Sequence, residues 1–301
     1  MRAAVLTRYG DVDGLEVRDV PEPSVGPGKL KVRIAASSLN ALDVKLLSGN
    51  LRQWFPLELP AILGFDAAGE VVELGPGVSG FRVGDKVLGQ VRHGQAELAL
   101  TTPEQIARVP PGLSVVDAAA LPVVALTGTQ LLEEAVAPGP GDVVLITGAL
   151  GAVGRYAVHA ARRRKVRIIA GVRKRQLGEA AALGAERVVA LDDPAAVAAL
   201  PPLQGIADTV GGETVAALLP KLAPGGRLGS VVGEPAGAKE RDIQVRSIQS
   251  HADPVRLAQL AQEVASGTVV VPIAARFPLA QVREAFLAVR GGAGGKVLLT
   301  L

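Results

Sequence analysis

The feature that most constrains the fold is an apolar run, Val143 to Thr147, that leads through a glycine-rich turn into an alanine-rich stretch. The run is short and uninterrupted, which is typical of a parallel strand buried on both faces. Gly148, Gly151 and Gly154 follow it. Because glycine has no Cβ atom, the backbone can turn tightly and let a pyrophosphate approach the next helix N-terminus, where free N–H groups attract anions. This order predicts a dinucleotide-binding unit, although Ala149 replaces the first glycine of the usual pattern; the alternative is an ordinary turn between strand and helix.

Strand and helix patterns continue to alternate toward the C-terminus. A helical composition follows at Ala152–Arg163, and the next strand-like runs are Arg167–Gly171, Arg187–Leu191, Gly205–Val210 and Arg227–Val232. Strands that alternate with helices predict an α/β fold with a doubly wound parallel sheet, the Rossmann arrangement. Pro254–Ser266 has the pattern of an amphipathic helix that leads out of this domain.

The N-terminal third of the chain has a different character. Residues 1–110 carry strand patterns, such as Lys31–Ala36 and Glu70–Leu74, between many turn signals. A Pro-Pro-Gly run at 110–112 marks a boundary, and the tail ends in a further strand pattern at Lys296–Leu301. A length of 301 residues also favours about two domains.

Composition excludes several classes of protein. The chain has no Cys and only three histidines, His93, His159 and His251, so a zinc site would depend on carboxylates and we expect no metal. No apolar run is long enough to cross a membrane, and the N-terminus lacks the apolar core of a signal peptide, so we expect a cytoplasmic protein. The net charge of +3 conceals a cluster of eight basic residues between Arg162 and Arg175.

Six segments carry a resemblance to a known family: Asn40–Gly49, Gly64–Gly75, Gly80–Val87, Ala118–Gly128, Asp208–Gly212 and Pro224–Leu228. With them the chain resembles, over essentially its whole length, the zinc-independent, zeta-crystallin-like quinone oxidoreductases of the medium-chain dehydrogenase/reductase family. The resemblance implies a β-rich, GroES-like catalytic domain at residues 1–110 and 268–301. It implies a Rossmann nucleotide-binding domain inserted at residues 111–267. It also implies an oxidoreductase that acts on a small molecule as a homodimer.

The same resemblance suggests three site residues. Asn40 and Lys45 correspond to catalytic positions on the substrate loop, and Thr127 corresponds to a residue near the nicotinamide. Asn40 would donate to the acceptor carbonyl or to the nicotinamide ribose, and Lys45 would supply charge or a proton. The alternatives are a turn-forming Asn40, a solvated surface Lys45, and a Thr127 hydroxyl bonded to its own helix.

The residues after the second strand of the Rossmann unit indicate the cofactor. A carboxylate there would bind the 2′-hydroxyl of NAD, but the sequence has Arg173, Lys174 and Arg175. Guanidinium groups can clamp a 2′-phosphate, so we expect NADPH; the alternative is a set of exposed charges, and Asp192 is a neighbour that would weaken a phosphate site. The full set of expected cofactor contacts is Thr127, Gly148, Leu150, Gly151, Ala152, Val153, Arg173, Lys174, Arg175, Val210, Val231 and Val232.

The acceptor is less constrained by the sequence. Related enoyl-thioester reductases carry a proton-donating Tyr after the substrate loop, whereas here the only tyrosines are Tyr9 and Tyr156. We therefore expect a quinone, and an enone or alkenal double bond is the alternative acceptor. The basic cluster leaves a third alternative, a nucleic-acid-binding or structural protein on this scaffold. Only 3% of the residues are aromatic, so a base-stacking surface is not expected.

Overall fold

The computed structural model describes residues 1–301 and divides into two compact units. The first unit contains residues 1–123 and 252–301, and the second contains residues 124–251. These boundaries differ from the expected divisions at 110/111 and 267/268. The reason is that two helices, α2 (Val115–Ala118) and α8 (Pro254–Ala265), lie against strands of the first unit instead of the second.

The first unit is built on two β-sheets. A seven-stranded sheet has the order β15-β16-β3-β5-β6-β8, with β7 paired to β3, and a three-stranded sheet has the order β2-β1-β4. The strands are β1 (Arg2–Leu6), β2 (Leu15–Asp19), β3 (Leu30–Leu39), β4 (Ala61–Ile62), β5 (Asp66–Leu74), β6 (Lys86–Gln90), β7 (Leu98–Thr101), β8 (Ile106–Arg108), β15 (Ile273–Pro278) and β16 (Lys296–Thr300). This arrangement confirms the expected β-rich domain.

The C-terminal strand β16 completes the sheet from the opposite end of the sequence. It runs antiparallel to β3 with Val297 opposite Leu39 and Leu298 opposite Ser38. On its other side β3 pairs with β5, and Ser38 stands opposite Asp66. The ends of three strands that are distant in sequence therefore meet at one place, just before the helix α1 (Ala41–Leu47).

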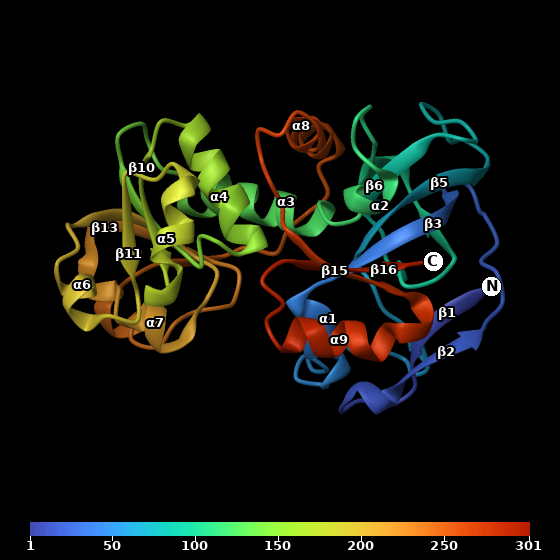
Figure 1. The fold of residues 1–301 in the computed structure, drawn as a ribbon, viewed down its shortest axis with the longest axis horizontal. Coiled ribbons are helices and arrows are strands. Elements are labelled where there is room, and N and C mark those ends of the chain that lie inside the picture. Colours follow the sequence, from blue (N-terminus) through green and yellow to red (C-terminus); the bar gives the residue numbers. More distant parts are fainter. The chain divides into compact units, whose positions relative to one another are not determined.

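A hydrophobic core holds the helices of this unit against its sheets. Figure 1 shows α1 beside α9 (Val282–Arg290), drawn in blue and red. Leu46 and Leu47 of α1 share a buried cluster with Ala285 and Phe286 of α9. The apolar residues of α9 recur at three- and four-residue spacing, so one face of the helix is buried.

The second unit is the doubly wound domain that the sequence predicts. Its six strands are all parallel and have the order β11-β10-β9-β12-β13-β14. The order reverses direction between β9 and β12, which is the switch point where such sheets bind ligands. The strands are β9 (Val143–Thr147), β10 (Arg167–Val172), β11 (Arg187–Ala190), β12 (Leu203–Asp208), β13 (Leu222–Ser230) and β14 (Val245–Ser247).

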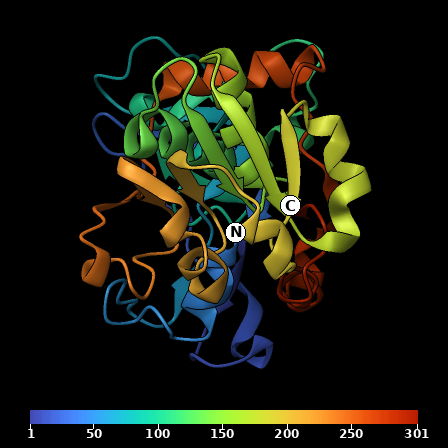
Figure 2. The ribbon, with the colours of Figure 1, turned by 90° about the vertical axis from the view of Figure 1, so that its left-hand side faces the viewer.

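Both faces of this sheet are covered, as Figure 2 shows for the unit that faces the viewer. Along β9, Val144 and Ile146 point into one core, and Val143 and Leu145 point into another. Because successive strand residues point to opposite faces, a continuous apolar run is what a strand between two helical layers requires. The helices are α3 (Pro122–Gln130), which starts in the first unit, the π-helical η3 (Leu131–Val136), α4 (Ala152–Arg163), α5 (Leu177–Ala180), α6 (Pro194–Ala198) and α7 (Gly212–Ala216).

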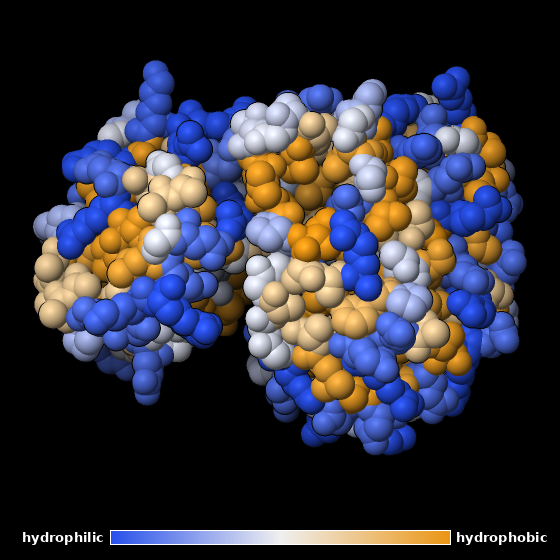
Figure 3. Space-filling view, viewed as in Figure 1, coloured by the Kyte–Doolittle hydropathy of each residue, from blue (hydrophilic) through white to orange (hydrophobic).

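In the space-filling view, hydrophilic residues lie around the rim of each unit and hydrophobic residues form patches on the face turned to the viewer (Figure 3). No helix combines the length and the apolar character that crossing a lipid bilayer demands.

Candidate active site and cofactor site

Asn40 lies in a buried network of charged and polar side chains within the first unit. It stands between the end of β3 and the start of α1, and only 9% of it is exposed. Its Nδ2 donates to Asp66 Oδ2 over 2.8 Å, and its Oδ1 accepts from Lys296 Nζ over 2.7 Å. The Asn40 side chain is therefore bonded to distant partners and does not close the local turn.

Asp66 is the centre of this network. Its Oδ2 accepts hydrogen bonds from Ser38 Oγ and Asn40 Nδ2 and lies 3.4 Å from Lys296 Nζ. Its Oδ1 accepts from the backbone N–H of Val123 over 2.6 Å, in the first turn of α3. The carboxylate thus has a partner for each oxygen, which buried charge requires.

Asp43 is a second buried carboxyl group beside the first. It accepts from the backbone N–H of Asn40 over 2.8 Å and from Gln95 Nε2 over 3.3 Å. Burial raises the pKa of Asp43 to about 7, against the lowering effect of the Asn40 N–H, and the nearby charge of Asp66 raises it further. Burial also lowers the pKa of Lys296, which Asp66 and Asp43 oppose. One buried cation therefore serves two carboxyl groups.

Lys45, the other expected catalytic residue, lies apart from this network. It is exposed on the surface of α1, whereas Asp43 on the same helix is buried. Lys45 and Asn40 therefore belong to the same sequence motif but do not contact each other in the fold. The structure leaves its chemical role a prediction.

In the second unit the expected glycine turn connects β9 to α4. Gly148 has φ +59°, and a Cβ there would lie 2.6 Å from Thr209 Oγ1. A Cβ on Gly154 would lie 2.2 Å from the carbonyl oxygen of Gly148, so these two glycines permit close packing within the turn. Gly151 is exposed and no side chain caps the helix that follows it, so the first N–H groups of α4, from Ala152 and Val153, are free for an anion.

Asp208 fixes the neighbouring strand ends at the same edge of the sheet. It is fully buried at the end of β12 and accepts from Thr147 Oγ1 of β9 and Ser230 Oγ of β13, each over 2.9 Å. Its Oδ1 also accepts hydrogen bonds from the backbone N–H groups of Val210 and Gly211. These bonds set the course of the loop after β12 and explain why the apolar side chain of Val210 is 49% exposed there.

The remaining apolar residues expected at the cofactor lie at this carboxyl edge too. Val231 and Val232 follow β13 directly, and Val232 is 40% exposed. Leu150 lies in the glycine turn and is largely buried. Exposed valines at strand ends are the apolar surface on which a nicotinamide or adenine ring can lie.

The basic residues after β10 are exposed, and a carboxylate lies beside them. Arg173, Lys174 and Arg175 follow the strand end, and their side chains form no ion pair in the structure. Asp192 accepts the backbone N–H of Lys174 over 2.7 Å, so the expected acidic neighbour is present. The two guanidinium groups are therefore exposed and without an anionic partner, and whether Asp192 weakens a phosphate site there stays a prediction.

Thr127 belongs to the second unit and lies on α3. It is 9% exposed, and its hydroxyl does not bond to its own helix, which differs from the alternative considered above. The group is thus free to bond a ligand. Thr127 and the glycine turn are in the second unit, whereas Asn40 is in the first.

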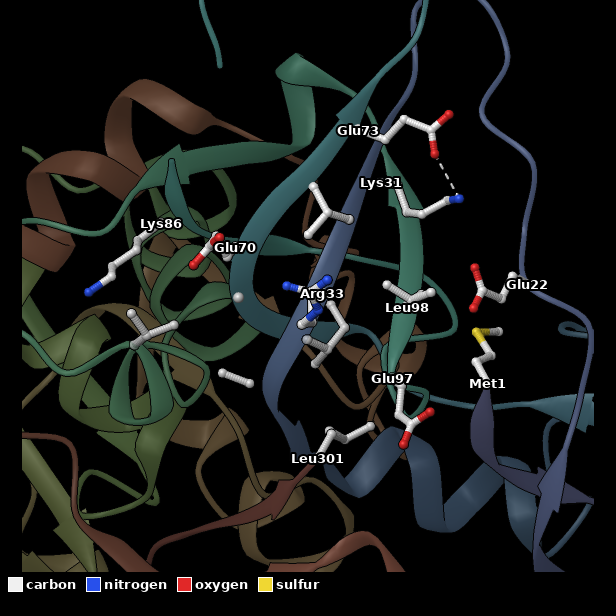
Figure 4. Close-up of a pocket in the computed structure, with 15 residues that line it drawn as sticks. Met1, Glu22, Lys31, Arg33, Glu70, Glu73, Lys86, Glu97, Leu98 and Leu301 are labelled. Carbon is white, nitrogen blue, oxygen red and sulfur yellow. Dashed lines mark ion pairs between the residues drawn. The ribbon is translucent and has the colours of Figure 1, made fainter. Parts of the chain in front are cut away.

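A separate cavity of the first unit lies away from this site. It has a volume of about 770 Å³ and is an open groove over β3, β5 and β6 (Figure 4). Its charged lining includes Arg33, Glu70 and Lys86, all exposed, and an ion pair of 2.8 Å between Lys31 and Glu73. No residue of the Asn40 network lines it.

Nowhere among residues 1–301 do three or more His, Cys, Asp or Glu side chains gather in a way that could hold a metal ion. Of the two carboxyl groups in the Asn40 network, Asp66 lies 3.4 Å from Lys296 Nζ, and the charge of Lys296 also lowers the pKa of Asp43.

Comparison with known proteins identifies the class to which this fold and site belong. Residues 26–163 match the alcohol dehydrogenase GroES-like domain, and residues 183–299 match a family described as zinc-binding dehydrogenase. The chain belongs to the medium-chain dehydrogenase/reductase family, whose members are oxidoreductases that bind a nicotinamide cofactor.

Within this family the chain is similar to proteins named quinone oxidoreductases. A chloroplast envelope quinone oxidoreductase homolog of Arabidopsis thaliana is 29% identical, over 99% of this chain and 98% of the relative. The solved quinone oxidoreductase of Coxiella burnetii has a TM-score of 0.90 and 29% identity, over 100% of this chain and 99% of that one. A solved NAD-dependent alcohol dehydrogenase has a TM-score of 0.87 and 27% identity, with all of both chains covered.

Three residues of these networks were not expected from the sequence. Asp66 and Asp208 lie inside segments that carry the family resemblance, but nothing in those segments shows which atoms they contact. Lys296 gave one signal, because it is a charged residue that begins an otherwise apolar strand and yet is 4% exposed. A charge in an apolar strand indicates a buried partner, but the sequence does not say which one.

Proposed function

We propose that this protein is an NADPH-dependent quinone oxidoreductase that transfers hydride directly from the nicotinamide to a quinone, without a metal. The observation that carries the proposal is the carboxyl edge of the second unit. There an uncapped helix N-terminus follows Gly151, and the unpaired Arg173 and Arg175 follow β10 where a carboxylate would serve NAD. These groups fit a pyrophosphate and a 2′-phosphate.

The residues of the glycine turn would hold the pyrophosphate by backbone N–H groups, and Arg173 and Arg175 would hold the 2′-phosphate. Exposed Val210 and Val232 would support the apolar parts of the cofactor. The bound cofactor supplies a hydride equivalent, two electrons and a proton, to the acceptor. Together with one further proton from solvent, this converts a quinone to a hydroquinone.

The Asn40 network supports the acceptor half of the proposal. Charge develops on the carbonyl oxygen of a quinone as it accepts hydride, and a preorganised N–H donor stabilises that charge. Asn40 is held by two charged partners and has such a donor. The names of the relatives support the same choice of acceptor. We further propose that the protein acts as a homodimer in the cytoplasm.

The test is a comparison of cofactors and acceptors on one preparation treated with EDTA. Fluorescence titration should show tighter binding of NADPH than of NADH. Steady-state assays should show faster turnover of a benzoquinone or naphthoquinone than of an α,β-unsaturated aldehyde. Equal binding of NADH, or activity that EDTA removes and Zn²⁺ restores, would contradict the cofactor or the metal-free mechanism respectively.

The fold weakens the nucleic-acid alternative, because that alternative depends on the basic cluster between Arg162 and Arg175 forming one surface. Arg162 and Arg163 lie in the last turn of α4, before β10, whereas Arg173 and Arg175 follow β10. A six-residue strand is ~20 Å long, so the basic run is divided between opposite edges of the sheet. Arg167 also forms an exposed ion pair with Glu186.

A further inference from the structure

The Asn40 amide has one orientation that its charged neighbours permit. A side-chain amide can be turned over with little change of shape, so its chemistry decides which end is the carbonyl. Lys296 can only donate hydrogen bonds, and the Asp66 carboxylate can only accept them. Turning the amide over would place N–H against the ammonium and Oδ1 against the carboxylate.

Lys296 and Asp66 have few hydrogen-bonding positions left without a partner. The three hydrogens of the Lys296 ammonium face the backbone oxygen of Leu39 at 3.1 Å, Asn40 Oδ1 at 2.7 Å and Asp66 Oδ2 at 3.4 Å. Asn40 Nδ2 carries two hydrogens, and one of them is bonded to Asp66 Oδ2. The other forms no bond within the protein.

We propose that Lys296 and Asp66 are positioning residues that hold the Asn40 amide with its remaining N–H directed to the acceptor carbonyl. Lys296 withdraws electron density from Oδ1, which makes the N–H groups on Nδ2 stronger donors. Asp66 fixes the rotation of the amide and ties it to the first turn of α3 through Val123. The inference rests on the proposed function for the identity of the acceptor, but the state of the amide can be measured without substrate.

The chain offers a direct measurement, because Asn40 and Asn50 are its only asparagines. Protein labelled with ¹⁵N in the asparagine side chain should show two NH₂ signal pairs, and loss of one pair in Asn50→Ser assigns the other to Asn40. In the wild type the two Asn40 protons should differ widely in chemical shift, because only one of them is bonded to a carboxylate. Lys296→Met should shift this pair, and Lys86→Met, which removes an exposed lysine of β6, should not.

Kinetic measurements then test whether the fixed orientation of the Asn40 amide contributes to turnover. Lys296→Met should lower kcat for a quinone at least tenfold and leave the Kd for NADPH within about twofold, and Lys296→Arg should recover part of the loss. In an Asn40→Ala background the same Lys296→Met change should alter kcat less than twofold, because it acts through the amide. If Lys296→Met does not fold, Lys296→Met/Asp66→Asn removes both charges together and takes its place.

The outcomes separate this inference from the proposed function. An Asn40 signal pair that is unchanged in Lys296→Met overturns the inference, whatever the enzyme reduces. A large additional loss of kcat from Lys296→Met in the Asn40→Ala background also overturns it, because Lys296 would then act independently of Asn40. A wild-type protein that shows the expected NMR signals but does not reduce quinones contradicts the proposed function alone.

Discussion

Lys296 donates a hydrogen bond of 2.7 Å to Asn40 although 256 positions separate the two residues. The contact forms because β16 runs antiparallel to β3, so its first residue, Lys296, lies at the end of β3 where α1 begins. Burial of both residues gives the bond a low-dielectric environment, in which charge-assisted hydrogen bonds are strong and a lost partner is costly. This relationship and the cofactor site lead to five predictions.

Replacing Asn40 with Ala should slow quinone reduction. A single donor to a developing oxyanion contributes about 2–4 kcal/mol, so kcat should fall about 10- to 1000-fold. The rate is measured per folded molecule, together with the melting temperature of the same preparation. Asn50→Ala, at an exposed position beyond the same helix, serves as the control and should retain the wild-type rate. A normal rate in folded Asn40→Ala would remove this residue from the site.

The raised pKa of Asp43 predicts how stability depends on pH. The folded state keeps the proton until about pH 7, whereas the unfolded chain releases it near pH 4. Folding therefore binds a proton between these values, and the free energy of unfolding should fall as pH rises through this window. The loss should amount to a few kcal/mol at most.

Asp43→Asn is the matched variant for this prediction, because it removes the titrating group. Gln95 Oε1 lacks a partner and could accept a hydrogen bond from the new amide. Urea unfolding at pH values from 5 to 8 should give a difference in stability, wild type minus variant, that decreases as pH rises. Lys296 and Asp66 face the same group and are present in both proteins. A difference that is constant with pH would show that Asp43 is ionised throughout.

Removal of Arg173 and Arg175 should change the cofactor preference. Each charge-assisted bond to a 2′-phosphate is worth about 1.5–3 kcal/mol, so each substitution to Ala should weaken NADPH binding about tenfold or more. Binding of NADH should change little. Arg167→Ala removes a charge from the other end of β10 and should leave both affinities unchanged. Fluorescence titration of the three variants with both nucleotides makes the comparison.

The same site contains an opposing charge that can be tested separately. Asp192→Asn should strengthen NADPH binding several-fold, because a carboxylate beside the basic residues repels the phosphate. If NADH binding weakens more than NADPH binding strengthens, Asp192 bonds a ribose instead, and the assignment of the basic residues to a phosphate is wrong.

Two glycines of one turn should respond differently to substitution. Gly151 is exposed where the pyrophosphate is expected, and a Cβ there would lie 3.1 Å from the Gly148 carbonyl oxygen, so Gly151→Val should remove NADPH binding at a modest cost in stability. Gly154→Ala places a Cβ only 2.2 Å from a backbone oxygen, so it should cost about 1–3 kcal/mol of stability. Calorimetry with NADPH and thermal unfolding distinguish the two effects. Wild-type NADPH affinity in Gly151→Val would show that the phosphates bind elsewhere.

The sequence by itself determined the elements and their type. The apolar run of β9 and the helix at Ala152–Arg163 have the predicted bounds, because hydrophobic periodicity and glycine positions are local properties of the chain. Thr147 ends the strand as predicted. Local sequence also showed basic residues at Arg173–Arg175, where NAD sites carry a carboxylate, and from this it predicted a preference for NADPH.

Tertiary structure alone decided which of these residues meet. It assigned α2 and α8 to the first unit because their apolar faces lie against its strands, and no local pattern specifies the surface that a helix covers. It placed the basic residues of one sequence cluster at opposite ends of β10. It brought Lys296 and Asp66 to Asn40 through antiparallel strand registers, and it left Lys45 in solvent. Strand pairing and burial act across the whole chain, so the charge network that holds Asn40 exists only after the sheet has closed.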